Sequence, residues 1–573
     1  MSNMKIILEK FFRPQLILLY ILAFSFLVRV AGIGYGLPLW LIDDEPPFTL
    51  AALKMIQLKT LLPVFHLDEF KTFLYYPPYL SYLYLFPFSA LLAAKYLFFS
   101  GGLGQFLNYT VSDLSQFFII ARFLNVAFGV LSVWLLYKIA KNIFSAEGGS
   151  LPAGRRGASG GGYEYVALLS AFFLGTSLFH ILLSATGRHW LPVSFLFILG
   201  LFFLSDEKLS RQKRFLYAML VAGVGIGVSI ITVLLTFLIL YWYLFYEKES
   251  VKDLLRGKTF YLASFLFVVL VILPAVIYPG SFGFGGDMTA GNTKTFFGIL
   301  QSPFLFLKPV ALSEPILLIF AVIGLVLAFL HKRRFFWPVF LFIYTYSAIF
   351  YLFFRYEHRF TISLFPLLAI LAAYGFYECY RGISNRIISI GFILILVVPL
   401  VLSLRLSYLI YNDDSRIHAR QWIEENIPQG SKILVYARLT RLSSVKEAIQ
   451  EQKKIDSGSL RKVDIAEENL APDRPDAFHA LNFYSISNPE FYKDIKNYAL
   501  ANGYQYLFME MDNFNRSQEQ WNQIRQVADG KQEITSFGGA PEDYSVFIGQ
   551  LTGNPFYLFK LKELGPSVRL YKL

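Results

Sequence analysis

Long apolar runs fill the first part of the chain, and most of them approach the length that crosses a lipid bilayer as a helix. A transmembrane helix needs roughly 20 mostly apolar residues. Runs of this kind lie at 15–32, 121–140, 164–183, 190–205, 215–229, 231–246, 259–278, 314–331, 335–354, 360–380 and 386–410. The pattern therefore predicts a polytopic α-helical membrane domain over residues 1–410, with about 11 transmembrane helices.

Basic residues predict how these helices are oriented, because lysine and arginine favour the cytoplasmic side of a membrane. They cluster at 138–156, 208–214, 248–258, 332–334 and 381–386, which places these segments and the N-terminus in the cytoplasm. One further apolar stretch, 79–99, would break the alternation of sides. Pro77 and Pro78 precede it directly and Pro87 interrupts it, so we expect it to lie along the outer face as a juxtamembrane helix.

Residues 411–573 lack such runs and alternate helical with extended patterns. The stretch SRIHARQWIEENI has helical spacing, with Ile417, Trp422 and Ile423 as core contacts, and KILVYA has the pattern of a buried strand. NPEFYKDIKNYALANG followed by YQYLFME repeats this order, and RSQEQWNQIRQVA is another helix. The alternation predicts a small extracytoplasmic α/β domain over 411–573.

The composition agrees with a membrane protein. Of the 573 residues, 55% are hydrophobic, 18% aromatic and 16% charged, a combination that soluble domains rarely show. The cytoplasmic basic clusters explain most of the formal net charge of +12, so we expect no nucleic-acid partner. Cys379 is the only cysteine, which excludes a disulfide within the chain and a cysteine-rich metal site.

Three carboxylates follow the first predicted helix, in the stretch GLPLWLIDDEPPF. Asp43, Asp44 and Glu45 would lie at the outer membrane face, beside prolines and an aromatic residue. Simple loop solvation is the alternative interpretation, because adjacent acidic residues are frequent by chance in a chain of this composition.

A second acidic pair occurs in the stretch FHLDEFKTF, again on the predicted outer side. Asp68 and Glu69, with His66 nearby, are candidates for an acceptor site, a secondary acidic site or a metal site. Loop solvation is again the alternative interpretation, since short polar loops between apolar segments commonly carry such residues.

Several cations are predicted at the outer ends of membrane helices, against the usual charge bias. Arg122 begins a predicted span, Arg188 lies in the turn SATGRHWLP, and Arg355 and Arg359 lie in FRYEHRFTISLFP. A cation in a membrane is costly unless it is paired, so it usually has a function. Snorkelling of each side chain to lipid headgroups is the alternative.

Arginines and carboxylates on one membrane face favour a lipid-phosphate substrate. Guanidinium groups bind phosphate oxygens in a bidentate manner, and a neighbouring carboxylate can accept a proton from an incoming hydroxyl or amine. Together these groups suit displacement at a sugar carbon with a lipid phosphate as the leaving group. Because arginine offsets phosphate charge, we expect no essential divalent metal and no cofactor.

The order of the motifs resembles a known family. GLPLWLIDDEP, YYPPYLSYLYL, ARFLNVAFGVLSVWLLYKIAKNIF and YEHRFTISLFPLLAILAAYGF follow one another as in the membrane-embedded GT-C glycosyltransferases that use polyprenyl-phosphate sugars. Within them the chain resembles the protein O-mannosyltransferase and lipid A aminoarabinose transferase group, of the glycosyltransferase family 39 kind. DDSRIHARQWIEENIPQGSKILV and LGPSVRLYKL are similar to the tail of many bacterial members.

This resemblance implies a GT-C fold and roles for single residues. Asp44 matches the presumed base, with Glu45 beside it. Arg122 and Arg359 match arginines of the family, and we add Arg188 and Arg355 as further candidates to bind the donor phosphate. Three positions depart from the family pattern, which affects the donor contacts and the sugar: Tyr76, Trp190 and Thr232.

The sequence thus predicts an inverting glycosyltransferase that moves a sugar from a polyprenyl-phosphate donor to an extracytoplasmic protein, lipid or envelope glycan. The family tail indicates a bacterial plasma membrane protein. A transporter or flippase of a lipid-linked sugar is the main alternative, and a non-catalytic membrane scaffold is a third. A transporter usually carries paired helix breaks in related halves, and the sequence shows no internal repeat.

Overall fold

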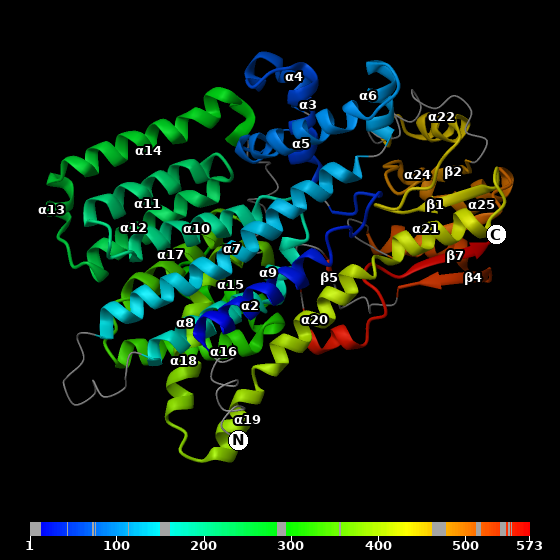
Figure 1. The fold of residues 1–573 in the computed structure, drawn as a ribbon. Helices are drawn as coiled ribbons and strands as arrows, with labels where there is room; N and C mark the ends of the chain where they lie inside the picture. Colours follow the sequence, from blue (N-terminus) through cyan, green and yellow to red (C-terminus); the bar gives the residue numbers. More distant parts are fainter. Residues whose placement is uncertain are drawn as a thin grey trace. The chain divides into compact units, whose positions relative to one another are not determined.

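The computed structural model describes residues 13–42, 44–71, 74, 76–112, 114–148, 161–282, 294–354, 357–460, 477–511, 517–538, 546–547, 550–551 and 553–573. The chain forms two compact units. Unit 1 comprises Met1–Ile33, Ile42–Tyr408 and Ile548–Leu558, and unit 2 comprises Gly34–Leu41, Leu409–Phe547 and Phe559–Leu573. Most of the predicted membrane domain lies in unit 1, whereas Gly34–Leu41 in the loop after the first helix belongs to unit 2. Figure 1 shows the elements coloured along the sequence.

Unit 1 is helical. Its first half contains α2 (Pro14–Val30), α3 (Pro46–Leu58), η1 (Pro63–His66), α4 (Leu67–Phe70), α5 (Tyr79–Leu97), α6 (Leu103–Ser112), α7 (Ser115–Gly148), α8 (Gly161–Gly175), α9 (Leu178–Ser184), α10 (Trp190–Ser205) and α11 (Arg211–Ile226). Its second half contains η3 (Ile230–Leu234), α12 (Leu235–Tyr241), η4 (Trp242–Tyr246), α13 (Val251–Arg256), α14 (Lys258–Ile277), η5 (Pro279–Phe282), α15 (Phe296–Ser313), α16 (Pro315–Leu330), α17 (Phe336–Phe353), η7 (His358–Leu364), α18 (Phe365–Arg381), α19 (Arg386–Leu394) and α20 (Val397–Tyr411), whose last three residues belong to unit 2. Within this unit α10 packs against α7 and α11, and α11 packs against α14.

Length and composition allow many of these helices to cross a membrane. Among the described residues, the seven that qualify are Tyr79–Leu97, Ser115–Ala146, Lys258–Ile277, Phe296–Ser313, Phe336–Phe353, His358–Arg381 and Arg386–Tyr411. Two bent helix pairs raise this number to nine, and four shorter apolar helices are Pro14–Val30, Trp190–Ser205, Ile230–Tyr246 and Pro315–Leu330. The prediction of a polytopic α-helical membrane protein is confirmed.

Two helices bear on the predicted topology. The stretch that we expect to lie along the outer face forms α5, which is long and apolar enough to span, so its in-plane placement stays a prediction. The apolar helix α15 was not among the predicted spans. Its interior prolines, Pro303 and Pro309, and the charge of Lys308 interrupt the hydropathy signal without ending the helix.

One predicted transmembrane span is broken into α8 and α9, whose axes differ by 56°. The carbonyl groups of Leu174 and Gly175, at the end of α8, accept hydrogen bonds of 3.2 and 3.0 Å from the buried Arg29 guanidinium. At the start of α9, the Phe179 N–H donates a 2.9 Å hydrogen bond to the Glu314 carboxylate. Each helix end therefore meets the charge that its dipole favours, and these contacts stabilise the break.

Small residues let neighbouring backbones approach. A Cβ added at Gly324 of α16 would lie 2.8 Å from the carbonyl carbon of Leu371 and 3.0 Å from the Gly375 nitrogen of α18. A Cβ added at Gly375 would lie 2.6 Å from the Gly324 nitrogen. Close backbone contact at small residues is a common way to pack membrane helices, because lipid supplies no hydrophobic force between them.

Unit 2 contains a five-stranded sheet with the order β2-β1-β3-β7-β4. Its strands are β1 (Lys432–Tyr436), β2 (His479–Asn482), β3 (Tyr506–Glu510), β4 (Gln532–Phe537) and β7 (Val568–Lys572). The first three are parallel, and β7 pairs antiparallel with β3 and with β4. The remaining elements that lie wholly in this unit are α21 (Ser415–Asn426), α22 (Lys446–Ile455), α24 (Pro489–Lys493), α25 (Ile495–Ala501), α26 (Gln518–Ala528) and β5 (Val546–Phe547). Strand β6 (Gln550–Leu551) belongs to unit 1, as does η8 (Pro555–Phe559) except for its last residue.

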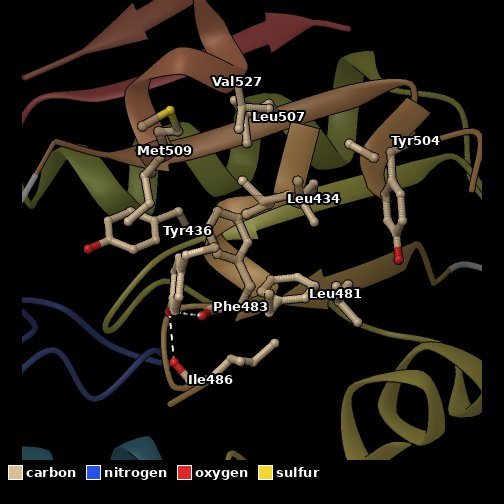
Figure 2. Packing of buried hydrophobic residues seen from close by; sticks show 14 of the residues in the cluster. Leu434, Tyr436, Leu481, Phe483, Ile486, Tyr504, Leu507, Met509 and Val527 are labelled. Carbon is tan, nitrogen blue, oxygen red and sulfur yellow. Dashed lines mark hydrogen bonds between the residues drawn. The ribbon is translucent and has the colours of Figure 1, made fainter. Parts of the chain in front are cut away.

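Both faces of this sheet are covered, because successive side chains of a strand point to opposite faces. Leu434 and Tyr436 of β1 join one apolar cluster with residues of α24, α25 and α26, part of which Figure 2 shows. Ile433 and Val435 join the other cluster, with Ala419 and Ile423 of α21. The predicted small C-terminal α/β fold is therefore confirmed, as is the core contact of Ile423.

We predict that Gly324→Ala destabilises unit 1 because its methyl group meets the α18 backbone. Forced repacking of a filled interior typically costs about 1–3 kcal/mol. The thermal unfolding midpoint of the purified protein in detergent should therefore fall. The matched control is Gly391→Ala in α19, where an added Cβ meets nothing within 4 Å. Equal midpoints for the two variants would contradict the close packing of α16 and α18.

Candidate functional site

Asp44 and Glu45 form a sharp backbone corner just before α3. Asp44 has a φ of 62°, in the left-handed region that few residues other than glycine adopt, although aspartate tolerates it better than most. Pro46 follows as the first residue of α3, where its fixed φ suits a helix start. This backbone corner separates the side chains of Asp44 and Glu45, which enter different surroundings.

Glu45 is fully buried and paired with Arg122 of α7. The Arg122 Nε and one terminal nitrogen donate to the two Glu45 oxygens, each at 2.7 Å, and neither side chain has exposed area. The other terminal nitrogen of Arg122 donates to the Ile33 carbonyl at 2.9 Å. Such a bidentate pair is the strongest form of charge-assisted hydrogen bonding. Contact of Arg122 with a substrate phosphate would compete with this pair.

The loop between α9 and α10 supplies a further hydrogen bond to Glu45. The Gly187 N–H donates to the Glu45 carboxylate at 2.6 Å, and a Cβ at this position would lie 2.9 Å from the same oxygen. Tyr84 of α5 donates to the Gly187 carbonyl at 3.0 Å, and the Asn125 amide of α7 donates to the Arg188 carbonyl at 2.7 Å. Helices α5 and α7 thereby fix the path of the loop that carries Arg188.

Asp44 lies between two other arginines. Its Oδ2 accepts from Arg188 at 2.7 Å and from Arg359 at 3.4 Å. The Asp44 side chain is 27% exposed, against 2% for Arg188 and 17% for Arg359. Glu357 forms a second ion pair, with the Nε edge of Arg359. Segments far apart in the sequence thus supply two carboxylates and two guanidinium groups to one partly open cluster.

Aromatic rings line the cluster. Tyr76 stacks on Phe48 with 4.9 Å between ring centroids, and lies 4.8 Å from the ring of His189. Burial, with the nearby Asp44 carboxylate, raises the pKa of Tyr76 to about 12. Burial and the neighbouring arginines hold the pKa of His189 well below its usual range. Both groups therefore stay neutral near pH 7 and leave the charge of the cluster to carboxylates and guanidiniums.

The structure brings together most of the predicted site residues. Arg188 and Arg359 both donate to the same oxygen of the Asp44 carboxylate. Glu45 and Arg122 form the adjoining buried pair. The candidates Asp43 and Arg355 lie outside the described residues. Their roles stay predictions.

The second acidic pair occupies a different, exposed segment. Asp68 is 92% exposed and forms a 3.0 Å ion pair with Lys71. Glu69 lies 3.8 Å from His66 and is 44% exposed. These local contacts are those of a solvated turn, and the described part of the chain contains no group of three or more His, Cys, Asp or Glu side chains that could hold a metal ion.

Three contributors to the cluster escaped the sequence reasoning. Glu357 stands two residues before Arg359 in the quoted stretch YEHRF, so its charge was the available signal. Gly187 and Asn125 act through backbone contacts, for which the sequence alone offers no spacing rule.

The fold and the cluster together define an integral membrane protein with an ionic site at the ends of its helices and a small α/β unit. Two solved structures of ArnT from Cupriavidus metallidurans are similar to the chain. The apo state gives a TM-score of 0.40 at 12% identity, covering 72% of this chain and 81% of that one. The form bound to undecaprenyl phosphate gives 0.42 at 12% identity, covering 74% and 83%.

The arabinofuranosyltransferase AftD from Mycobacteria is similar with a TM-score of 0.28 at 10% identity, over 78% of this chain and 33% of that one. No family model and no curated protein matches the sequence. Because these identities and scores are low, the chemistry of the chain is inferred from its own side chains.

We predict that Arg122→Met strongly destabilises the protein, because it leaves the Glu45 carboxylate buried without its partner. Removing one member of a buried ion pair typically costs about 3–5 kcal/mol. Adding Glu45→Gln should restore part of the loss, since no charge then remains buried. Thermal unfolding in detergent measures both effects.

The control for this pair is Lys493→Ala, which opens a 2.7 Å ion pair with Glu490 whose members are 58% and 75% exposed. Exposed pairs contribute little, so the midpoint should not move. A small effect of Arg122→Met, equal to that of the control, would show that the buried pair does not hold the site together.

Proposed function

We propose that the chain is an integral-membrane glycosyltransferase that transfers a sugar from a polyprenyl-phosphate donor to an extracytoplasmic acceptor, with Asp44 as the general base. One observation supports this above all: Asp44 Oδ2 lies 2.7 Å from Arg188 and 3.4 Å from Arg359. A proton acceptor and two phosphate-binding groups therefore share one partly exposed site. These are the groups that sugar transfer from a lipid phosphate requires.

The reaction would be a single displacement. Asp44 accepts the proton of an acceptor hydroxyl or amine as that atom attacks the anomeric carbon. The new bond forms on the face opposite the phosphate while the bond from carbon to phosphate oxygen breaks, so the configuration inverts. The polyprenyl phosphate leaves with the bonding electron pair. The guanidinium groups stabilise the negative charge that develops on its oxygen.

The arginines divide into two kinds under this proposal. Arg188 and Arg359 contact the donor phosphate, with Arg355 as a further candidate, because guanidinium groups match two phosphate oxygens at once. Arg122 acts through Glu45 as a positioning residue, since both Glu45 oxygens accept its hydrogen bonds. The Gly187 N–H on the same carboxylate connects this pair to the loop of Arg188.

The membrane setting suits such a donor. The apolar helices place the cluster in a protein that lipid surrounds, and a polyprenyl chain partitions into the same hydrocarbon phase. We further propose that the site opens on the extracytoplasmic face of a bacterial plasma membrane, with the N-terminus in the cytoplasm and unit 2 outside. Labelling of single added cysteines in a Cys379→Ser background would test this orientation.

We predict that Asp44→Asn lowers transfer by about 10²–10⁴-fold, the usual range for losing a general base. The assay supplies purified protein in liposomes with polyprenyl-phosphate sugars and envelope acceptors, and measures free polyprenyl phosphate released with the sugar product. The control is Asp529→Asn, an exposed aspartate at the end of α26. Full activity of Asp44→Asn would remove this residue from catalysis.

The same assay separates a transferase from a flippase. Release of polyprenyl phosphate together with a glycosylated acceptor supports the transferase. Movement of an intact labelled donor across the liposome membrane without turnover supports the transporter and would overturn the proposal.

A further inference from the structure

Arg359 is held from several directions at once. Its Nε edge forms an ion pair with the Glu357 carboxylate, in which the Nε–H makes no hydrogen bond, and a terminal nitrogen lies 3.4 Å from Asp44. Its guanidinium carbon lies 5.7 Å from the ring centroids of Trp190 and of Phe360. A guanidinium with aromatic neighbours and a carboxylate at one edge has little freedom to rotate. Its orientation is therefore set before any substrate arrives.

The two arginines on Asp44 differ in how firmly they hold it. Arg188 is 2% exposed and contacts Asp44 at 2.7 Å, whereas Arg359 is 17% exposed and its contact is longer, at 3.4 Å. The backbone carbonyl of Arg188 accepts a hydrogen bond from the Asn125 amide, which fixes the backbone at this residue. Arg188 is thus the fixed partner of Asp44, and the weaker, more exposed contact of Arg359 is the one that an incoming anion displaces most easily.

Formal charge leads to the same conclusion. Among the described residues of the cluster, the carboxylates of Asp44 and Glu357 match the guanidiniums of Arg188 and Arg359 in number. A donor phosphodiester brings one further negative charge, which would repel Asp44 if both anions stayed on the same nitrogen. The repulsion falls if Arg359 releases Asp44 and turns to the phosphate while Asp44 stays on Arg188.

We propose that Glu357 is a positioning residue that holds Arg359 by its Nε edge, so that the terminal nitrogens of Arg359 exchange Asp44 for the donor phosphate. This inference rests on the proposed function. In the exchange, Asp44 Oδ2 replaces its contact with Arg359 by one with the acceptor hydroxyl or amine. Donor binding would then prepare the base, which limits activation of the acceptor to the loaded enzyme.

A change at Glu357 should shift phosphate affinity in the direction opposite to that expected from charge alone. Removing a negative charge beside a phosphate site should tighten phosphate binding by Coulomb attraction alone. If Glu357 instead orients Arg359, then Glu357→Ala should weaken it. The experiment measures binding of undecaprenyl phosphate and of undecaprenol, which share the hydrocarbon chain, to the full-length protein in detergent.

We expect Glu357→Ala to weaken undecaprenyl phosphate binding about tenfold, with undecaprenol binding unchanged. Glu357→Gln keeps an oxygen at the Nε edge and should recover part of the affinity. In transfer assays the donor KM should rise more than kcat falls. Glu490→Ala, which opens the exposed pair with Lys493, is the matched control and should behave as wild type.

A double-mutant cycle guards against a variant that simply folds poorly. In an Arg359→Ala background, Glu357→Ala should have no further effect on binding, because the group that it orients is gone. Additive losses, or tighter phosphate binding by Glu357→Ala, would overturn the positioning role while the proposed function stands. Wild-type protein that binds the phosphate no better than the alcohol, and transfers no sugar, would overturn both.

Discussion

Glu45 and Arg122 share two hydrogen bonds of 2.7 Å where neither side chain has any exposed area. Moving two charges out of water carries a penalty that their attraction repays only with good geometry and further hydrogen bonds. Both conditions are met, because the Gly187 N–H and the Ile33 carbonyl occupy remaining positions on the pair. The Glu45 carboxylate therefore joins the start of α3 to the body of α7 through Arg122, and to the loop before α10 through Gly187.

The neighbouring carboxylate depends on that anchor. Asp44 adopts a left-handed φ of 62°, a conformation that generally costs of order 1–3 kcal/mol outside glycine and persists where surroundings enforce it. Glu45 on one side and Pro46 at the start of α3 on the other supply this constraint. Two neighbouring acidic residues therefore lie in different surroundings. The Glu45 carboxylate is fully buried, and the partly exposed Asp44 carboxylate contacts Arg188 and Arg359.

Hydropathy predicted most of the helices because the bilayer fixes their length and leaves backbone groups no other partner. It missed α15, whose Pro303, Lys308 and Pro309 lower the apolar signal while the helix continues. It also missed the break between α8 and α9, which depends on Arg29 reaching carbonyl groups about 145 residues later in the chain. Such long-range partners leave no periodic trace in a single sequence.

The candidate site shows the same limit. Position after the first helix pointed to the acidic stretch, charge against the topology bias pointed to Arg188 and Arg359, and the motif resemblance selected Asp44 among the three carboxylates. They did not tell which arginine pairs with which carboxylate, because residues 44 and 45 differ in direction only through a backbone corner. The sequence also did not indicate that Glu357 pairs with Arg359, because this contact depends on the backbone turn that begins η7.

The pairing itself explains how arginines can lie in a protein that lipid surrounds, and it suits the anion site that we propose. Arg188 and Arg359 without counter-ions would be costly in a medium of low dielectric constant. Asp44 and Glu357 oppose that charge, and Tyr76 and His189 add none near pH 7. Lysine would concentrate its charge at one atom, whereas the guanidinium distributes its donors around a plane and can serve two anions at different edges. That property lets Arg359 keep Glu357 at one edge while its other edge meets Asp44. In the exchange that we propose, an anion would therefore replace Asp44 without leaving a bare cation.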